Sequence, residues 1–223
     1  MADDLHNPGS VGESAYQRIR ADIVFGRLEP GRKLKLDGLK AAYGASVSTL
    51  REILNRLASE RLVVAEGQKG FEVAPVSIAN LREIAALRQL LECRALEQSF
   101  RAGDMEWEGR VVAAHYRLAR MEERMAAGDR SGTEEWKRYD WQFHQALISA
   151  CGSRMLIDTH AAVFDKYLRY QMLALGYRGG IAAEEHALLL DCALKRDAAQ
   201  ACAVLTRHVA GGVEHALATG TIS

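Results

Sequence analysis

Proline is scarce in this sequence, and its absence is most informative in the C-terminal part. Of the 223 residues only three are proline, and none follows Pro75. Proline removes a backbone hydrogen-bond donor and breaks helix interiors, so its absence permits long helices. No strand-like alternation of polar and apolar residues appears there either, and Ser77 is suited to cap a first helix. We therefore expect residues 76–223 to form an all-helical bundle.

Long apolar runs are also lacking. No run approaches the roughly 18 residues that a membrane-spanning helix needs. The first residues, Met1–His6, include neither the basic nor the apolar segment of a secretion signal. We expect a cytoplasmic protein with no membrane partner.

Cysteines with metal-binding spacing are absent. The four cysteines show no C-x-x-C spacing and lie within helical apolar patterns, where cysteine behaves as a small hydrophobic residue. They are Cys93, Cys151, Cys192 and Cys202. We therefore expect neither disulfides nor a zinc knuckle.

The chain has no excess of charge of either sign, because 29 basic residues balance 29 acidic ones. Nucleic-acid-binding proteins usually present a basic surface, so the distribution of charge matters more than its sum. Between Pro30 and Arg56, six basic residues stand against two acidic ones. This modest basic patch includes Lys35 and Lys40, which we expect to contact DNA.

Length and composition favour two domains. A chain of 223 residues exceeds one typical domain, and 48% hydrophobic with 26% charged residues is ordinary for a globular protein. We expect a disordered N-terminus at residues 1–12, a first domain at residues 13–75 and a second at residues 76–223.

The first domain contains a helix-turn-helix pattern. A short helix at Leu36–Tyr43 is expected to end at Gly44, a residue suited to the left-handed cap, and Ser46 can cap the helix that follows. That helix repeats apolar residues at i, i+3, i+4 and i+7, namely Leu50, Ile53, Leu54 and Leu57. One face is therefore buried, and the N-terminal turn is left to enter a major groove.

Two strand-like segments follow, Leu62–Val64 and Phe71–Val73, and they predict a β-wing. The hairpin tip would place Gln68 and Lys69 near the DNA backbone. From periodicity alone, a small helical domain with a two-stranded appendage and solvated charges stays an alternative.

Four polar residues of the second domain fall on faces that periodicity assigns to the core. Asp140 and His144 lie one helical turn apart, and His186 and His208 each align with apolar neighbours. Asp140 and His144 alone are more typical of a solvated ion pair. Three inward histidines and an aspartate, however, are hard to satisfy separately. If the four side chains converge on a divalent transition metal, all of them are satisfied at once. Imidazole and carboxylate ligands favour zinc, with nickel, manganese or iron as alternatives.

Two arginines are candidates for binding the carboxylate of an effector. Arg88 lies on the apolar stripe of Leu81, Ile84, Leu91 and Ala95. It could form an ion pair with Glu92, or its guanidinium could bind the carboxylate of a ligand, and the sequence leaves both interpretations open. Arg169, among tyrosines at a helix end, is a second candidate. Of the other histidines, His6 is expected to lie in the loose N-terminus, and His115, His160 and His215 are expected to be surface or packing residues.

The first domain resembles the winged helix of the GntR family of bacterial transcriptional regulators. The resemblance lies in Gly26–Gly31, Leu39–Leu54, Leu57–Val63 and Lys69–Phe71. It implies DNA contacts from the start of the recognition helix and from the wing tip: Ser46, Ser48, Thr49, Arg51 and Gly70. Val47 departs from the pattern, because many members have arginine there, and a guanine contact is then missing.

The second domain resembles the metal-binding FCD domains of the FadR branch of that family. The match covers the C-terminal two-thirds and implies that Asp140, His144, His186 and His208 are metal ligands. It further implies small organic acids as effectors. A weaker resemblance, including Glu60–Val63 and Gln68–Gly70, is to the glutarate-responsive carbon-starvation repressors.

These features predict a mostly α protein, with an N-terminal winged helix-turn-helix and a C-terminal FCD-like helical bundle. We expect a homodimeric, ligand-responsive regulator, not an enzyme, that represses transcription from a double-stranded DNA operator and senses a small carboxylate. A metal-dependent hydrolase is one alternative, although no general base has a motif position and the winged helix is left unexplained. A constitutive DNA-binding protein without an effector is the other.

Overall fold

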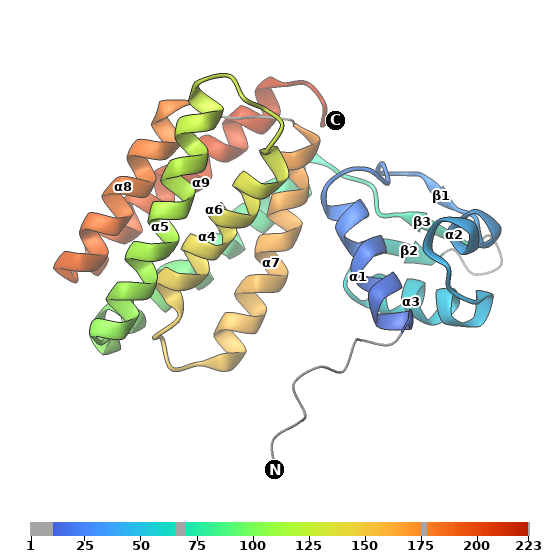
Figure 1. Cartoon of the computed structure of the whole chain (residues 1–223), viewed down its shortest axis with the longest axis horizontal. Helices are drawn as coiled ribbons and strands as arrows, with labels where there is room; N and C mark the ends of the chain where they lie inside the picture. The colour runs from blue at the N-terminus through green and yellow to red at the C-terminus, as the bar shows by residue number, and fades with distance from the viewer. Residues whose placement is uncertain (1–10, 66–69, 175–177, 223) are drawn as a thin grey trace, which may run out of the picture. The chain divides into compact units, whose positions relative to one another are not determined.

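Nine helices and three short strands make up the part of the chain that the computed structural model describes, residues 11–65, 70–174 and 178–222 (Figure 1). They group into two units that divide between Val76 and Ser77. Disorder was expected for residues 1–12, and residues 1–10 lie outside the described residues. Val11 and Gly12 begin the first helix, so the first domain begins at residue 11 instead of the expected residue 13.

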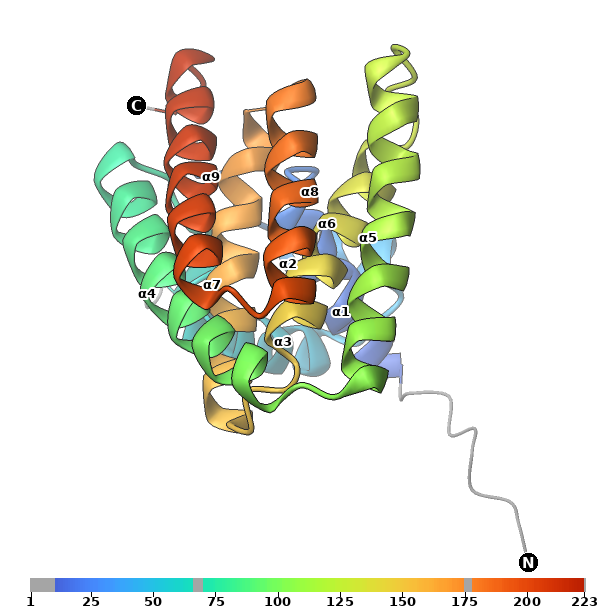
Figure 2. The same cartoon turned by 90° about the vertical axis from the view of Figure 1, so that its left-hand side faces the viewer.

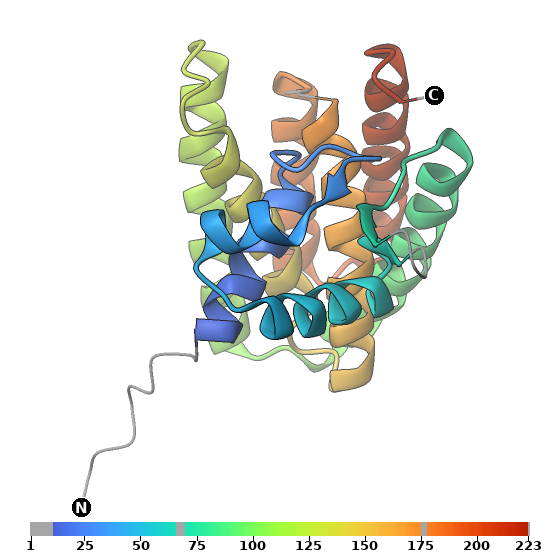
Figure 3. The same ribbon diagram turned by 90° about the vertical axis from the view of Figure 1, so that its right-hand side faces the viewer.

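The first unit combines three helices with a small sheet (Figure 3). The elements are α1 (Val11–Val24), β1 (Lys33–Leu34), α2 (Leu36–Tyr43), α3 (Val47–Ser59), β2 (Val63–Ala65) and β3 (Phe71–Val73). The strands are antiparallel in the order β1-β3-β2. The wing hairpin was expected, but β1 was not, because a two-residue strand carries no periodic signal.

Local sequence explains the turn between α2 and α3. Gly44 adopts the left-handed conformation with φ 70° and donates its N–H to the carbonyl of Lys40. The Ser46 side chain accepts a hydrogen bond from the Thr49 N–H, which caps α3. The apolar stripe of α3 is buried as predicted, and the helix packs against α1, α2 and β2.

The second unit contains only helices among its described residues, as expected. They are α4 (Ile78–Ala102), α5 (Met105–Ala126), α6 (Thr133–Ile148), α7 (Arg154–Leu173), α8 (Gly180–Lys195) and α9 (Ala198–Ala218). Figure 2 shows α9 and α8 between α4 on one side and α5 on the other, and α6 packs against α4, α5 and α7. The inward faces of α6, α8 and α9 hold the polar cluster described below.

The buried stripe of α4 differs from the prediction. Leu81 and Ala95 are buried, but Ile84 and Leu91 are only half-buried, and Leu90 is 68% exposed. Arg88 is buried, as its place on the predicted stripe indicated, and Ala85 and Glu92 are buried in place of Ile84 and Leu91. The buried face of α4 therefore holds a charged pair.

In the part of the chain that the structure describes, no helix is long and apolar enough to cross a membrane. The four cysteines all lie in this part and are free thiols.

Candidate metal centre

Three helices bring together the four polar residues that periodicity placed in the core. Asp140 and His144 come from α6, His186 from α8 and His208 from α9, and all four side chains are buried. Each offers one potential ligand atom, and these atoms lie within 4.8 Å of one another. Two atoms bonded to one ion at about 2.1 Å are about 4.2 Å apart at opposite positions and about 3.4 Å apart in a tetrahedron. The most distant pair of ligand atoms would therefore approach by roughly 0.6 to 1.4 Å if all four groups bound a single ion.

Helical spacing explains why these side chains meet. Asp140 and His144 are one turn apart on α6 and so point to the same side. His186 lies on the buried face of α8 with Ala182 and Leu189, and His208 follows Val204 and Leu205 on that of α9. Each side chain occupies a position that an apolar residue would otherwise fill.

Asp140 is the centre of the contacts within the cluster. Its Oδ1 lies 3.1 Å from Nε2 of His186 and 3.6 Å from Nε2 of His144. Arg88 Nη2 lies 3.3 Å from the same Nε2 of His144. A metal ion bound at that nitrogen would replace the guanidinium contact.

Electrostatics keep three of the four groups ready to bind a cation. Burial lowers the pKa of His208, and the neighbouring His186 adds to this effect. Burial also lowers the pKa of His144, although Glu92 opposes it. For Asp140, burial opposes ionisation, but Lys137 and the histidines outweigh it and hold the pKa well below its usual range. A carboxylate and two neutral imidazoles are the forms that ligate metals.

His186 behaves differently from the other two histidines. Burial opposes a charge on its ring, but the hydrogen bonds to Asp140 and Glu122 outweigh burial and raise its pKa to about 9. In the metal-free protein the His186 ring is therefore protonated on both nitrogens and positively charged near neutral pH. Binding of a metal through His186 would displace one of these protons.

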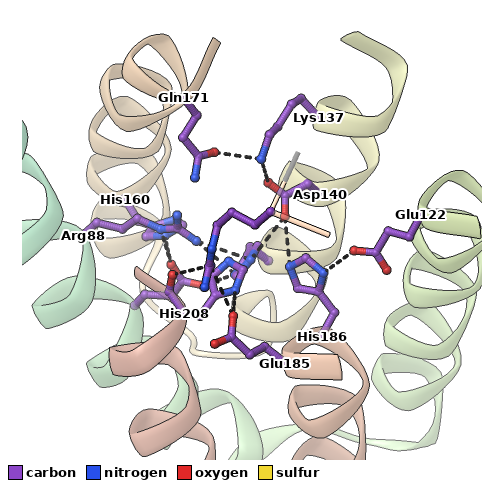
Figure 4. A network of polar contacts seen from close by, with 12 residues as sticks. Arg88, Glu122, Lys137, Asp140, His160, Gln171, Glu185, His186 and His208 are labelled. Carbon is purple, nitrogen blue, oxygen red and sulfur yellow. Dashed lines mark hydrogen bonds and ion pairs between the residues drawn. The ribbon is translucent and has the colours of Figure 1, made fainter. Parts of the chain in front are cut away.

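A small pocket, partly open to solvent, adjoins the cluster. Its described lining includes Asp140, His186 and His208, and also two cationic side chains, Lys137 and Arg178. The Lys137 ammonium donates to Asp140 Oδ2 at 3.3 Å and to Gln171 Oε1 at 2.9 Å (Figure 4). The pocket thus combines a potential metal with positive charge.

Arg178 is anchored on two other elements of the bundle. Its Nη1 donates to Glu185 Oε2 at 3.3 Å and to the carbonyl of His208 at 2.9 Å. Glycine at position 211 makes room for it, since a Cβ there would lie 2.1 Å from Arg178 Nη2. The guanidinium is therefore held beside the histidine cluster.

The two arginines predicted to bind an effector are not in the described lining of this pocket, although Arg88 contacts His144. Arg88 is fully buried, donates to Glu92 at 3.0 Å and stacks on Phe164 and Tyr167 at 4.3 and 4.7 Å. Arg169 is buried too, and the described lining of this pocket includes neither arginine. The ion pair between Arg88 and Glu92, one of the two interpretations that the sequence left open, is present in the structure.

Sequence reasoning missed several residues around the cluster. His160, expected to be a surface or packing residue, is buried with its Nε2 2.9 Å from Glu92 Oε2. His215 lines the pocket. Lys137 was detectable, because it precedes Asp140 by three residues on one helical face. Arg178 was not, because it lies in the connection between α7 and α8, where periodicity gives no information.

The predicted DNA-binding residues of the first unit lie together at its surface. Ser46, Ser48 and Arg51 are exposed around the first turn of α3, Thr49 is half-buried there, and Lys35 and Lys40 are exposed in and before α2. Ser46 Oγ lies 2.8 Å from Ser48 Oγ and 2.9 Å from Thr49 Oγ1. Gly70 is half-buried at the start of the wing's second strand. Gln68 and Lys69 lie outside the described residues.

Both domains of the chain match known protein families. Residues 12–73 match the family described as bacterial regulatory proteins, gntR family, and residues 83–211 match the FCD domain. The uncharacterised HTH-type transcriptional regulator BphR of Paraburkholderia xenovorans (strain LB400) is 38% identical over 211 residues, covering 94% of this chain and 86% of that protein.

A second relative and a solved structure agree. The HTH-type transcriptional repressor GlaR of Escherichia coli (strain K12) is 31% identical over 201 residues, which cover 87% of this chain and 90% of that protein. The structure of E. coli McbR/YncC superposes with a TM-score of 0.78 at 20% identity, covering 94% of this chain and 98% of that one, and so supports the fold.

Proposed function

Because this chain belongs to the GntR family of bacterial transcriptional regulators and carries an FCD effector domain, we propose that it is a repressor that senses a small organic acid at a buried metal ion. The family and the relatives named above are transcription regulators and not enzymes. The name of GlaR, a transcriptional repressor, supports repression as the direction of control.

The observation that carries the metal is the buried convergence of Asp140 with three histidines. Burying such groups without compensation is costly, and a divalent cation compensates all four at once. Three imidazoles and one carboxylate favour zinc, with nickel, manganese or iron as alternatives. A metal that takes five or six ligands would have open coordination positions beyond these four for a ligand oxygen.

The pocket beside the cluster indicates an anionic effector. Lys137 and Arg178 line it together with three of the four proposed ligands. A carboxylate of a small acid would reach the metal, and the two cations would stabilise its negative charge. Arg88 and Arg169, the effector residues expected from sequence, are replaced by Lys137 and Arg178 in this proposal.

We propose that the first unit binds an operator through the first turn of α3. The exposed hydroxyls of Ser46 and Ser48, with Thr49 and Arg51, would enter the major groove, and Lys35 and Lys40 would contact phosphates. The wing tip, with Gln68, Lys69 and Gly70, would follow the backbone. A homodimer would match two half-sites of an operator. This function places the protein in the bacterial cytoplasm.

Thermal unfolding against a panel of small mono- and dicarboxylates tests this function. The protein is measured metal-loaded and chelator-treated. A ligand at about 100 times its dissociation constant stabilises the native state by roughly 2.7 kcal/mol, which is easily detected. We expect one class of acid to raise the unfolding temperature, and only when the metal is present.

Two outcomes would contradict the proposal. If no acid shifts the metal-loaded protein, a constitutive DNA-binding protein becomes the better account. If an acid binds equally well after chelation, the effector site does not depend on the metal.

A further inference from the structure

Each histidine of the cluster has a buried or nearly buried glutamate at its other ring nitrogen. His186 Nδ1 lies 2.7 Å from Glu122 Oε1, and His208 Nδ1 lies 2.9 Å from Glu185 Oε2 (Figure 4). His144 Nδ1 is in hydrogen-bond contact with Glu92 Oε1. The three carboxylates come from α5, α8 and α4. The same atom, Nδ1, is engaged in all three rings.

The consistent use of Nδ1 decides which nitrogen is free for a cation. A neutral imidazole carries one N–H, and a carboxylate can only accept a hydrogen bond. When the ring is neutral, a glutamate at Nδ1 therefore keeps the proton there and leaves the lone pair on Nε2 for a cation. Two of the Nε2 atoms already face Asp140 Oδ1, at 3.1 Å from His186 and 3.6 Å from His144.

We propose that Glu92, Glu122 and Glu185 are positioning residues that fix the three histidines in the Nδ1-protonated form, so that a metal binds through Nε2. This inference rests on the proposed metal centre. A carboxylate at the distal nitrogen orients the ring and makes it a stronger donor to a metal. None of the three glutamates would touch the ion itself.

The glutamates also connect the cluster to residues beyond it. Glu185 Oε2 accepts from Arg178 Nη1 as well as facing His208, so it joins a proposed metal ligand to a cation of the pocket. Glu92 contacts Arg88 and His160 in addition to His144. Through Glu92 and Glu122, helices α4 and α5 are tied to the centre although neither carries one of the four proposed ligands.

Glu122→Gln is the most direct test. Glu92→Gln would leave the buried Arg88 without its carboxylate, and Glu185→Gln would also disturb Arg178, so both change more than one contact. Glutamine keeps the size of Glu122 but removes its charge. We expect metal affinity to fall by about 10- to 100-fold. Glu123→Gln, the exposed neighbour on α5, is the matched control and should bind metal like the wild type.

The outcomes separate this inference from the proposed function. Wild-type protein that binds no metal would overturn the metal centre itself. Wild-type protein that binds metal while folded Glu122→Gln binds it equally well would overturn only the role of the glutamates. Circular dichroism of both variants establishes whether they are folded.

A measurement on the wild type does not depend on any variant. With ¹⁵N-labelled histidine and zinc bound, long-range proton–nitrogen spectra distinguish the two ring nitrogens. We expect three rings with a proton on Nδ1 and zinc on Nε2, each assigned by loss of its signals on substitution. Zinc bound at Nδ1, or a proton on Nε2, in these rings would contradict the inference.

Discussion

Asp140 is the residue on which the polar contacts of the cluster converge. One carboxylate oxygen faces His186 and His144, and the other accepts from Lys137. Buried charges of this kind are stable only when they are paired. The lysine satisfies one oxygen and leaves the oxygen that faces the histidines available to a cation.

Removal of one histidine should abolish strong metal binding without affecting DNA binding. In His208→Ala we expect metal affinity to fall by more than about 100-fold, because even the loss of a partner outside the coordination sphere costs 10- to 100-fold. Metal content by mass spectrometry and operator affinity are the two measurements. Wild-type metal occupancy in this variant would contradict its role as a ligand.

The second ring proton of His186, which gives the imidazole its positive charge, should make the stability of the metal-free protein depend on pH. The folded chain holds this proton with a pKa of about 9, against about 6.5 for an unfolded histidine. Its stabilisation is therefore complete below about pH 6.5 and is lost as the pH rises through about 9. We expect the unfolding midpoint in chelator to fall across this range, and to fall less in His186→Gln. Equal pH dependence of the two proteins would contradict the assignment.

Gly212 on α9 leaves room for the side chain of Tyr167 on α7. A Cβ at residue 212 would lie 2.1 Å from the hydroxyl oxygen of Tyr167, a buried ring whose hydroxyl donates to the Val209 carbonyl at 3.0 Å. We expect Gly212→Ala to lower the free energy of unfolding by about 1–3 kcal/mol. Gly109→Ala is the matched control, since a Cβ there meets nothing within 4 Å. Urea unfolding should show that the control is unchanged or more stable by up to about 1 kcal/mol.

Helix α3 should determine DNA affinity independently of the metal. Arg51 is exposed one turn after the N-cap, where an arginine can reach a base or a phosphate. We expect Arg51→Ala to weaken binding to an operator, selected from random duplexes, by about 1–3 kcal/mol, with metal content unchanged. Arg154→Ala, on α7, should bind the operator like the wild type. Undiminished affinity in Arg51→Ala would contradict the placement of the recognition helix.

The sequence predicted those elements whose cause is local. Gly44 and Ser46 mark the turn between α2 and α3 by their own backbone and capping preferences, and periodicity placed His186 and His208 on buried faces. Strand β1 escaped prediction because two residues carry no period. On α4 the predicted positions of Leu81, Arg88 and Ala95 are buried, but Ala85 and Glu92 are buried in place of Ile84 and Leu91, because apolar periodicity does not predict a buried carboxylate.

The contacts between helices could not be predicted from sequence. Glu122 lies 64 positions before His186, its partner, and Glu185 precedes His208 by 23. No spacing rule links residues on different helices at such separations. Arg178 likewise reaches the pocket from a connecting segment. The four proposed ligands were predictable because each had to be satisfied in the core, but their partners required the structure.

For the whole molecule, the proposed function requires that two units respond to one another. A small acid changes operator affinity only if it binds two arrangements of a dimer unequally, and the operator then changes the affinity for the acid by the same factor. The winged helix continues in sequence into α4, the helix that carries Glu92. This continuity links the DNA-binding unit along the chain to the helix that contacts His144.

A metal at the centre of the helical bundle is the claim on which this account depends. Anomalous diffraction from crystals of the metal-loaded protein, collected above and below the absorption edge of the metal, locates it directly. We predict one peak per chain, about 2.1 Å from Nε2 of His144, His186 and His208 and from an oxygen of Asp140. A bundle interior without a peak, or a peak bound by other residues, would contradict the account.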